Sequence, residues 1–202
     1  MHEHHQVPVR LTDGGTAMLR PLEPGEDAAL LAVFEGLSAR SRELRFLTAM
    51  NTLRPSVVRA LTDVDGCRHV AWLATVDGRP AGIARYVRIP DGPADLAFEV
   101  ADAQQGRGLG SLLLDAVATV ARANAVNRVS ATVHPGNRVS VHLLRRYGLV
   151  LQLSYGVLEG DASLCLPEPA LVDRAAVLDL AVRSAVLAGR PLPCGASSSS
   201  VA

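Results

Sequence analysis

The sequence predicts one α/β domain of the α+β type, in which mostly antiparallel strands and several helices share a single core. The chain has 202 residues, of which 49% are hydrophobic, and this is enough to bury one sizeable core. Strand-like and helix-like patterns alternate along most of its length. Three strand patterns also follow one another between residues 69 and 101 with only short connections, which favours antiparallel pairing.

The first part of the chain is expected to supply one strand and several helices. Residues 1–15 show no periodicity, and we expect a flexible N-terminal arm there. A strand is predicted over residues 16–22. Residues 23–38 then favour a helix, because a proline and acidic residues stand at its start. Two further short helices are predicted within residues 38–47 and 54–63.

The middle of the chain predicts three consecutive antiparallel strands. Residues 69–76 and 82–89 are rich in strand-forming residues and are joined across Asp77 and Gly78, a pair typical of a type I′ hairpin turn. Residues 94–101 alternate large apolar side chains with smaller or charged ones and predict the third strand.

The next part of the chain predicts a helix, a strand, a second helix and a closing hairpin. Apolar residues recur at helical spacing after the glycines at 106–110, which predicts an amphipathic helix with one buried face formed by Leu109, Leu112, Leu113, Val117 and Val120. Residues 128–135 predict a strand. A helix then begins with Asn137 as its N-cap and ends before Gly148, and residues 149–167 form the hairpin.

The C-terminal region predicts one more helix and a tail. Apolar positions between residues 169 and 189 fall on one helical stripe, made of Leu171, Ala175, Leu178, Val182 and Ala185. This helix is expected to cover the sheet or a partner subunit, which leaves a homodimer open. Residues 190–202 are of low complexity and are expected to be disordered. The compact domain is therefore predicted to run from residue 16 to residue 168.

The composition argues against several classes of protein. The 20 basic residues are all arginine and balance 20 acidic residues, so we expect neither a nucleic-acid surface nor a membrane anchor. A chain without lysine has no P-loop motif G-x-x-x-x-G-K-[ST] and no Schiff-base chemistry. The three cysteines cannot all be paired and no signal-peptide core is present, so a cytoplasmic protein is expected. The N-terminal histidines lack carboxylate or thiolate partners, and no metal site is expected.

The stretch QGRGLGS, which begins at Gln105, combines three glycines with a helix N-terminus. A helix N-terminus leaves backbone N–H groups unpaired and carries a partial positive charge, so it attracts phosphate without lysine. Gly106, Gly108 and Gly110 let the main chain approach a ligand that a Cβ atom would repel. Arg107 can add a bidentate guanidinium contact. The predicted ligand is therefore a pyrophosphate.

Three interpretations compete for this glycine turn. It could be a tight strand-to-helix connection whose glycines serve geometry alone. It could also be a Rossmann dinucleotide turn, but the context disagrees, because three antiparallel strands precede it and the next strand ends in His134-Pro135 instead of an acidic residue. The third interpretation is an acyl-CoA site.

The stretch VADAQQGRGLGSLLL resembles the Q/R-x-x-G-x-G/A signature of the GNAT N-acetyltransferase superfamily, with Gln105, Gly108 and Gly110 on the signature positions. The order of elements from about Thr16 to Pro167 is similar to that family. Upstream, LRPLEPGEDAALLAVFEGLSARSRELRFL resembles the opening of the catalytic domains of Pat-type bacterial protein lysine acetyltransferases. The resemblance implies the GNAT fold: a mixed, mostly antiparallel sheet of six to seven strands, helices on both faces, and a splayed strand pair that receives acyl-CoA.

The resemblance also implies a set of residues that bind acetyl-CoA. Main-chain groups of Val100 and Asp102 would line the pantetheine arm. Asn137 would bind the pantetheine or orient a water. The backbone amides that would hold the pyrophosphate run along the glycine turn through Gln105, Gly106, Arg107, Gly108, Leu109, Gly110 and Ser111.

Acetyl transfer to an amine requires a base, because a lysine amine with a pKa of about 10.4 is protonated near neutral pH. Asp95 and Glu99 are candidates, since their even spacing on one strand makes both carboxylates face the same way. Asp95 stands where Pat-type relatives usually have a Glu, and Glu99 lies nearer the glycine turn. Either could instead be a solvated strand residue or an ion-pair partner, for example of Arg85.

The general acid of the family has no obvious counterpart in this sequence. Many members have a Tyr seven residues after the Asn, and here that position is Leu144. Tyr147 lies three residues further on, and its helical spacing from Val139 and Leu143 favours a place in the core. The thiolate of CoA can also leave unaided, since a thiol has a pKa of about 8.5.

The sequence thus predicts an N-acetyltransferase that moves acetyl from acetyl-CoA to a primary amine by direct attack. The Pat-type resemblance favours a protein lysine side chain as the acceptor. Two alternatives stay open: a small amine as acceptor, and a non-catalytic regulatory protein that binds acyl-CoA.

Overall fold

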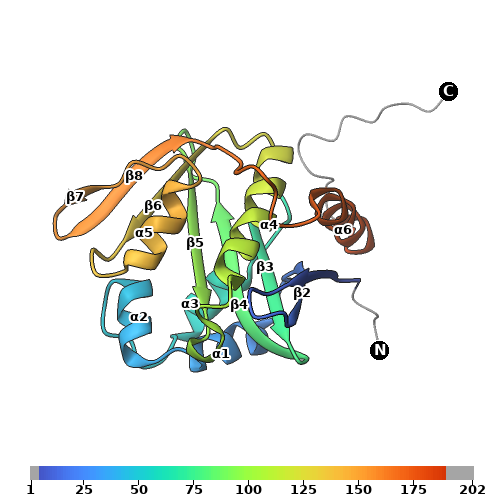
Figure 1. Ribbon diagram of the computed structural model, residues 1–202, viewed down its shortest axis with the longest axis horizontal. Helices are drawn as coiled ribbons and strands as arrows, with labels where there is room; N and C mark the ends of the chain where they lie inside the picture. The colour runs from blue at the N-terminus through green and yellow to red at the C-terminus, as the bar shows by residue number, and fades with distance from the viewer. Residues whose placement is uncertain (1–4, 190–202) are drawn as a thin grey trace.

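The computed structural model describes residues 5–189 and contains one mixed sheet with helices on both faces (Figure 1). The strands are β1 (Val7–Arg10), β2 (Thr16–Pro21), β3 (His69–Val76), β4 (Arg79–Val87), β5 (Ala94–Val100), β6 (Arg128–Val133), β7 (Gln152–Ser154) and β8 (Val157–Ser163). The helices are α1 (Asp27–Glu35), α2 (Ala39–Phe46), α3 (Pro55–Thr62), α4 (Leu109–Ala123), α5 (Arg138–Arg145) and α6 (Arg174–Leu187), with a short 3₁₀ turn at Asp102–Gln104.

The eight strands follow the order β1-β2-β3-β4-β5-β6-β8-β7. All neighbouring pairs are antiparallel except β5 and β6, which run parallel. The predicted fold class is therefore confirmed, with eight strands in place of six to seven.

The extra strand lies where the sequence analysis expected a flexible arm, and for residues 7–10 that expectation was wrong. β1 pairs with β2 through four residue pairs from Val7–Leu19 to Arg10–Thr16. The side chains of Val7 and Val9 are buried on the core side, while Pro8 and Arg10 are exposed. A proline in a four-residue segment hides the strand pattern in the sequence. Proline is nevertheless tolerated on an edge strand, because the N–H groups on the outer side of that strand need no partner.

Each face of the sheet has its own helical layer. On one face α4 packs against β3, β4 and β5, and α6 packs against α4, β1 and β2. On the other face α1 packs against β4 and α3. Neighbouring residues of β3 serve opposite faces, as the two-residue period of a strand requires: Trp72 belongs to the cluster under α4, and Leu73 to the cluster under α1.

The predicted hairpin between the third and fourth strands is confirmed. Asp77 and Gly78 have φ angles of 51° and 74°, and two positive φ angles at the central residues define a type I′ turn. The three helical segments predicted between residues 23 and 63 are also present, although the first begins at Asp27 and not at the proline.

The C-terminal helix is held by a buried carboxylate that the sequence analysis did not identify. Asp115 of α4 is fully buried and accepts hydrogen bonds from the N–H groups of Leu171 and Val172, at 2.6 and 3.1 Å. Its other oxygen lies 2.9 Å from Nη2 of Arg174. α6 therefore covers this chain's own α4. The predicted stripe was wrong in part, because Ala175 is exposed and the buried side chains are Val177, Leu180 and Ala185.

Two remaining expectations concern the tail and the membrane. Residues 190–202, predicted to be a tail, lie outside the described residues. Between residues 5 and 189, no helix combines the length and the apolar character needed to cross a bilayer.

Candidate active site

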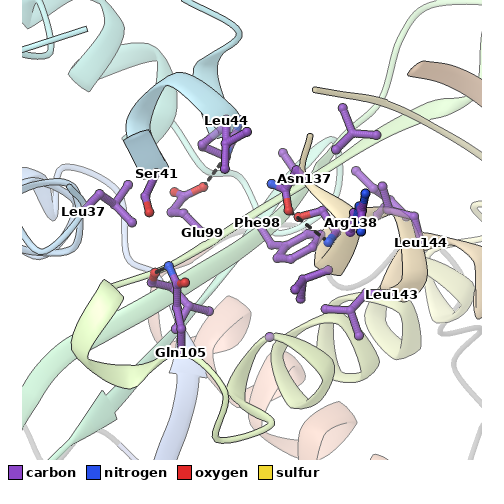
Figure 2. A pocket seen from close by; sticks show the side chains of 18 of the residues that line it. Leu37, Ser41, Leu44, Phe98, Glu99, Gln105, Asn137, Arg138, Leu143 and Leu144 are labelled. Carbon is purple, nitrogen blue, oxygen red and sulfur yellow. Dashed lines mark hydrogen bonds and ion pairs between the residues drawn. The ribbon is translucent and has the colours of Figure 1, made fainter. Parts of the chain in front are cut away.

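The parallel strands β5 and β6 separate soon after they meet. They pair only at Ala94–Val129 and Asp95–Ser130, although β5 continues to Val100 and β6 to Val133. Beyond this point the strands enclose a cavity of about 690 Å³. Side chains from β5, β6, α2, α5 and the first turn of α4 line it, and Figure 2 shows Phe98 and Glu99 on its strand side and Leu143 and Leu144 on α5. The splayed strand pair predicted from the sequence is therefore present.

The glycine turn forms one end of this cavity. Gly106 and Gly108 have φ angles of 75° and 83°, which a residue with a side chain rarely adopts, and Gly108 caps α4. Within the described chain, the backbone N–H groups from Gly106 to Gly110 donate to no acceptor. Five consecutive free donors at the start of a 15-residue helix form a site for an anion.

Gly110 has a different role from the other two glycines. A Cβ atom there would lie 3.4 Å from Leu143 Cδ1 and 3.7 Å from atoms of Phe98 and Val100, which is ordinary van der Waals contact. A methyl group would therefore fit, and this explains physically why a position of this kind accepts Gly or Ala.

The structure brings most of the predicted binding residues to the cavity. Gln105 fixes the end of β5, because its Nε2 donates to the carbonyl oxygen of Val100 at 3.0 Å and to Oδ1 of Asp102 at 3.0 Å. The predicted residues that line the cavity are Asp95, Glu99, Val100, Gln105, Gly106, Gly108, Leu109, Gly110, Ser111 and Asn137.

Asp102 and Arg107 do not line the cavity. The carboxylate of Asp102 accepts the N–H of Ser38 at 3.2 Å and joins the glycine turn to the segment between α1 and α2. The guanidinium of Arg107 lies against Asp13 and Gln104 instead of at the helix N-terminus. In this conformation Asp13 and Gln104 hold the guanidinium, and the phosphate contact of Arg107 stays a prediction.

Asn137 caps α5, as its position predicted, with Oδ1 accepting the N–H of Ser140 at 3.1 Å. Its side chain also faces the cavity (Figure 2). His134 accepts the N–H of Gly136 at its Nδ1 and so serves the turn before α5.

The expected core position of Tyr147 is confirmed. Its side chain is buried, and its hydroxyl lies 3.5 Å from the carbonyl oxygen of Ser111. Burial raises the pKa of this phenol, with the nearby Asp115 acting in the same direction. Leu143 packs against the same core, whereas Val139 is exposed. Tyr147 is not part of the cavity wall.

Glu99 is held by two arginines. Its Oε2 accepts from Nε of Arg45 at 2.6 Å, and its Oε1 accepts from Nη2 of Arg85 at 3.1 Å. Burial by itself would raise the pKa of this carboxyl group, but the charges of Arg45 and Arg85 outweigh burial and lower it. The ion-pair interpretation with Arg85 is therefore confirmed, and Arg45 is a partner that nothing in the sequence pattern singled out.

Asp95 occupies a different environment on the same strand. It is half-buried beside the point where β5 and β6 part, and none of the described residues forms a hydrogen bond or salt bridge with its carboxylate. Burial raises its pKa, and the charge of Arg45 opposes this shift only in part. A carboxylate with a raised pKa and free oxygen atoms beside a cavity has the properties of a general base.

The geometry agrees with a comparison to protein families. The model of the acetyltransferase (GNAT) family matches residues 38–149, which span α2 to the end of α5 and include all of the residues that line the cavity except Leu37. The chain belongs to this family. The family membership confirms the predicted acetyl-CoA-dependent N-acetyltransferase.

Individual GNAT relatives support the assignment. An acetyltransferase of Pseudomonas aeruginosa is 31% identical over 147 residues, which cover 70% of this chain and 79% of the relative. The acetyltransferase Pat of Mycolicibacterium smegmatis is 31% identical over 148 residues, which cover 71% of this chain but only 44% of that protein.

Solved GNAT structures show the same architecture. The crystal structure of the GNAT domain of S. lividans PAT superposes with a TM-score of 0.72 and 32% identity, covering 81% of this chain and 99% of that one. The acetyltransferase yncA of Salmonella typhimurium, solved with its cofactor acetyl-CoA, superposes with a TM-score of 0.59 over 76% of this chain and 97% of its own, and at 16% identity it supports the fold alone.

Among residues 5–189, no three His, Cys, Asp or Glu side chains gather in a way that could hold a metal ion.

Proposed function

We propose that this protein transfers the acetyl group of acetyl-CoA to the side-chain amine of a protein lysine, with Asp95 as the general base. The observation that carries the proposal is the cavity between β5 and β6, which joins three parts in one continuous wall: the free N–H groups of the glycine turn, the parted strand edge, and the Asp95 carboxylate.

The glycine turn suits the diphosphate of the coenzyme. Five N–H donors and the positive end of α4 supply the attraction that a lysine supplies in other phosphate sites. The unpaired edge of β5 beyond Asp95 offers main-chain hydrogen bonds to the amide groups of the pantetheine arm, as an added strand would receive them. This arrangement would place the thioester near the point where the strands part.

Asp95 suits the proton transfer at that point. The neutral amine attacks the thioester carbonyl carbon and forms the C–N bond, Asp95 accepts the proton released from the amine, directly or through a water, and the C–S bond breaks to release the CoA thiolate. The raised pKa of Asp95 brings it closer to that of its proton donor than an ordinary aspartate would be. Glu99 is a poorer base, because both of its oxygens are occupied by arginines.

The departing thiolate needs no partner from α5. The position at which many relatives have a tyrosine is Leu144, which is buried, and Tyr147 does not reach the cavity. A thiol of pKa about 8.5 is a sufficiently good leaving group to depart as the thiolate and take up a proton from solvent.

The acceptor is inferred from two lines of support. The N-terminal stretch through α2 resembles that of Pat-type enzymes, and α2 forms part of the cavity wall. Two of the similar proteins, from M. smegmatis and S. lividans, also carry the name Pat. The chain spans 44% of the M. smegmatis protein, so this support concerns its acetyltransferase domain.

The proposal is tested by binding and then by turnover. Isothermal titration with acetyl-CoA should show saturable binding, and its absence at millimolar concentration would overturn the proposal. Thiol release should then be measured with lysine peptides and, in parallel, with polyamines, aminoglycosides and free amino acids. Preference for the peptides supports a protein acceptor, whereas preference for a small amine keeps the chemistry and changes the acceptor. Because Cys165 is an exposed free thiol, each assay needs a protein-only blank.

Mass spectrometry offers a clean control for this assay. The chain contains no lysine, so every acetyl-lysine found after incubation must come from the added acceptor. We expect no acetyl-lysine in the enzyme itself, and acetylation of its chain only at the N-terminal amine.

A further inference from the structure

The guanidinium of Arg107 points away from the helix N-terminus and towards the turn between β1 and β2, residues 11–15. Its Nε donates to Oδ2 of Asp13 at 2.6 Å, and its Nη1 donates to Oε1 of Gln104. Oδ1 of Asp13 accepts the N–H of Gly15 at 3.0 Å, which fixes the carboxylate within the turn. A Cβ atom on Gly15 would lie 2.8 Å from Nη2 of Arg107, so the glycine leaves space for the arginine.

This arrangement leaves Arg107 poorly placed to bind a diphosphate. A bidentate contact uses two adjacent donors along one edge of the guanidinium. One edge contains Nε, which Asp13 occupies, and on the other edge Nη1 uses one of its two N–H groups for Gln104. Arg107 therefore has fewer donors to offer to a diphosphate while these contacts persist.

The backbone of Arg107 is held by the same turn. The N–H of Thr12 donates to the carbonyl oxygen of Arg107 at 3.2 Å. In a planar trans peptide the carbonyl and the following N–H point in opposite directions. When Thr12 holds the carbonyl of Arg107, the N–H of Gly108 is turned away from β1 and β2. That N–H is one of the free donors in the cavity wall.

From these contacts we infer that the β1–β2 turn is a positioning element for the diphosphate site, and that Asp13 and Arg107 act as one unit that sets the orientation of the glycine-turn N–H groups. The inference rests on the proposed function and adds residues outside the part of the chain that the family profile matches. Through this turn β1 supports the glycine turn in addition to extending the sheet. Both side chains are partly exposed, so the pair contributes little to global stability and acts through local geometry.

A double-mutant cycle tests the inference. The variants are Asp13→Asn, Arg107→Gln and the two combined, and the readouts are the Kd for acetyl-CoA by titration calorimetry and the KM and kcat for acetyl transfer. Each single variant should weaken binding by about tenfold, and the double variant should be no weaker than either single variant, because contacting residues couple strongly. kcat at saturating donor should change little. Asp161→Asn breaks the exposed pair with Arg128, away from the cavity, and is the matched control that should bind normally.

A truncated acetyl donor distinguishes an effect on the diphosphate site from a disturbance of the whole fold. S-acetylpantetheine lacks the diphosphate, so turnover with it should be equal in the wild type and in all the variants. An equal loss with both donors would instead indicate a disturbed fold and would overturn the inference.

Other outcomes also decide the matter. If Arg107→Gln weakens binding while Asp13→Asn leaves it unchanged or strengthens it, Arg107 contacts the phosphate directly and the inference is overturned. The same holds if neither variant changes the Kd. If the wild type itself binds no acetyl-CoA, the proposed function fails and this inference with it.

Discussion

The two ends of β5 carry the same chemical group in opposite environments. At the start of the strand, the carboxylate of Asp95 has no hydrogen-bond partner among residues 5–189, and burial raises its pKa. Four residues later, Glu99 is more deeply buried, yet its pKa is lowered because Arg45 and Arg85 outweigh burial. Burial alone therefore does not identify a base. The presence or absence of fixed positive partners decides which carboxylate can take up a proton and which remains a permanent anion.

This contrast divides the strand into a reactive end and a structural end. Glu99 joins the sheet to α2 through Arg45 and pairs with the buried Arg85, whose Nη1 also donates to the carbonyl of Leu61 at 2.7 Å. Asp95 forms no such contacts with the described residues and lies where the strands part. Substitutions at the two sites should therefore affect different measurements.

The largest effect is expected from Glu99→Gln, on stability. The change leaves Arg85, which is 2% exposed, without its charge partner, and removing one member of a buried pair typically costs about 3–5 kcal/mol. Urea denaturation should show this loss in the free energy of unfolding. The matched control is Glu43→Gln, which breaks an exposed pair with Arg40 on α2 and should cost less than about 1 kcal/mol. Equal losses of unfolding free energy in Glu99→Gln and Glu43→Gln would contradict the structural role assigned to this end of β5.

Asp95→Asn should have its main effect on catalysis. Removal of a general base lowers the rate by about 10²- to 10⁴-fold. We expect kcat to fall within this range while the Kd for acetyl-CoA stays near that of the wild type, and Asp95→Glu should retain part of the activity. Steady-state kinetics with the preferred acceptor measure this. Near-normal turnover by Asp95→Asn would show that the proton leaves by another route.

The pH dependence of stability should have opposite signs at the two sites. The folded-state pKa of Asp95 is raised, so its proton binding stabilises the fold fully below the unfolded pKa, and this contribution is lost as pH rises through the folded value. The folded-state pKa of Glu99 is lowered, so its contribution is present above the unfolded pKa and is lost as pH falls through the folded value.

Denaturation between neutral and acidic pH compares these signs directly. At neutral pH, Asp95→Asn should be as stable as the wild type or more so, because a buried charge is removed. Glu99→Gln should be less stable at neutral pH and should show a smaller further loss on acidification. Acid-side losses of the same size in both variants would contradict the assigned pKa directions.

The smallest expected effect is a shift in the pH profile of activity in Arg45→Gln. Arg45 lowers the pKa of Asp95 against the dominant effect of burial, so loss of its charge should raise that pKa further. Because the base must be ionised, the acid limb of kcat/KM should move to higher pH. Arg40→Gln, on the same helix and paired with Glu43, is the control and should leave the limb in place. If the acid limb of kcat/KM stays in place in Arg45→Gln, the charge of Arg45 does not affect the pKa of Asp95.

Many features of this fold could be predicted from short stretches of the sequence. The Asp77-Gly78 turn, the Asn137 cap and the glycine turn each depend on a few adjacent residues, and each is present as predicted. What was missed depends on contacts across the chain. β1 was not predicted, and it is stable because Val7 and Val9 pack against the core. The helix α6 was predicted, but its anchor was not: Asp115 accepts the N–H of Leu171, 56 residues later in the chain.

The site shows the same limit. The even spacing of Asp95 and Glu99 correctly placed both beside one cavity, but it could not distinguish them. The distinction comes from Arg45 on α2, 54 residues from Glu99 in the chain, and from Arg85 on the neighbouring strand. Arg107 illustrates the converse, since its place in the motif favoured a phosphate contact while Asp13, 94 residues away, holds its guanidinium.

A crystal structure of the protein soaked with acetyl-CoA would test the central claim most directly. The account predicts the diphosphate within hydrogen-bond distance of the N–H groups of Gly106 to Gly110, the pantetheine arm along the free edge of β5, and the thioester beside Asp95. A coenzyme bound elsewhere, or strands β5 and β6 drawn together along their whole length with the cavity closed, would contradict it.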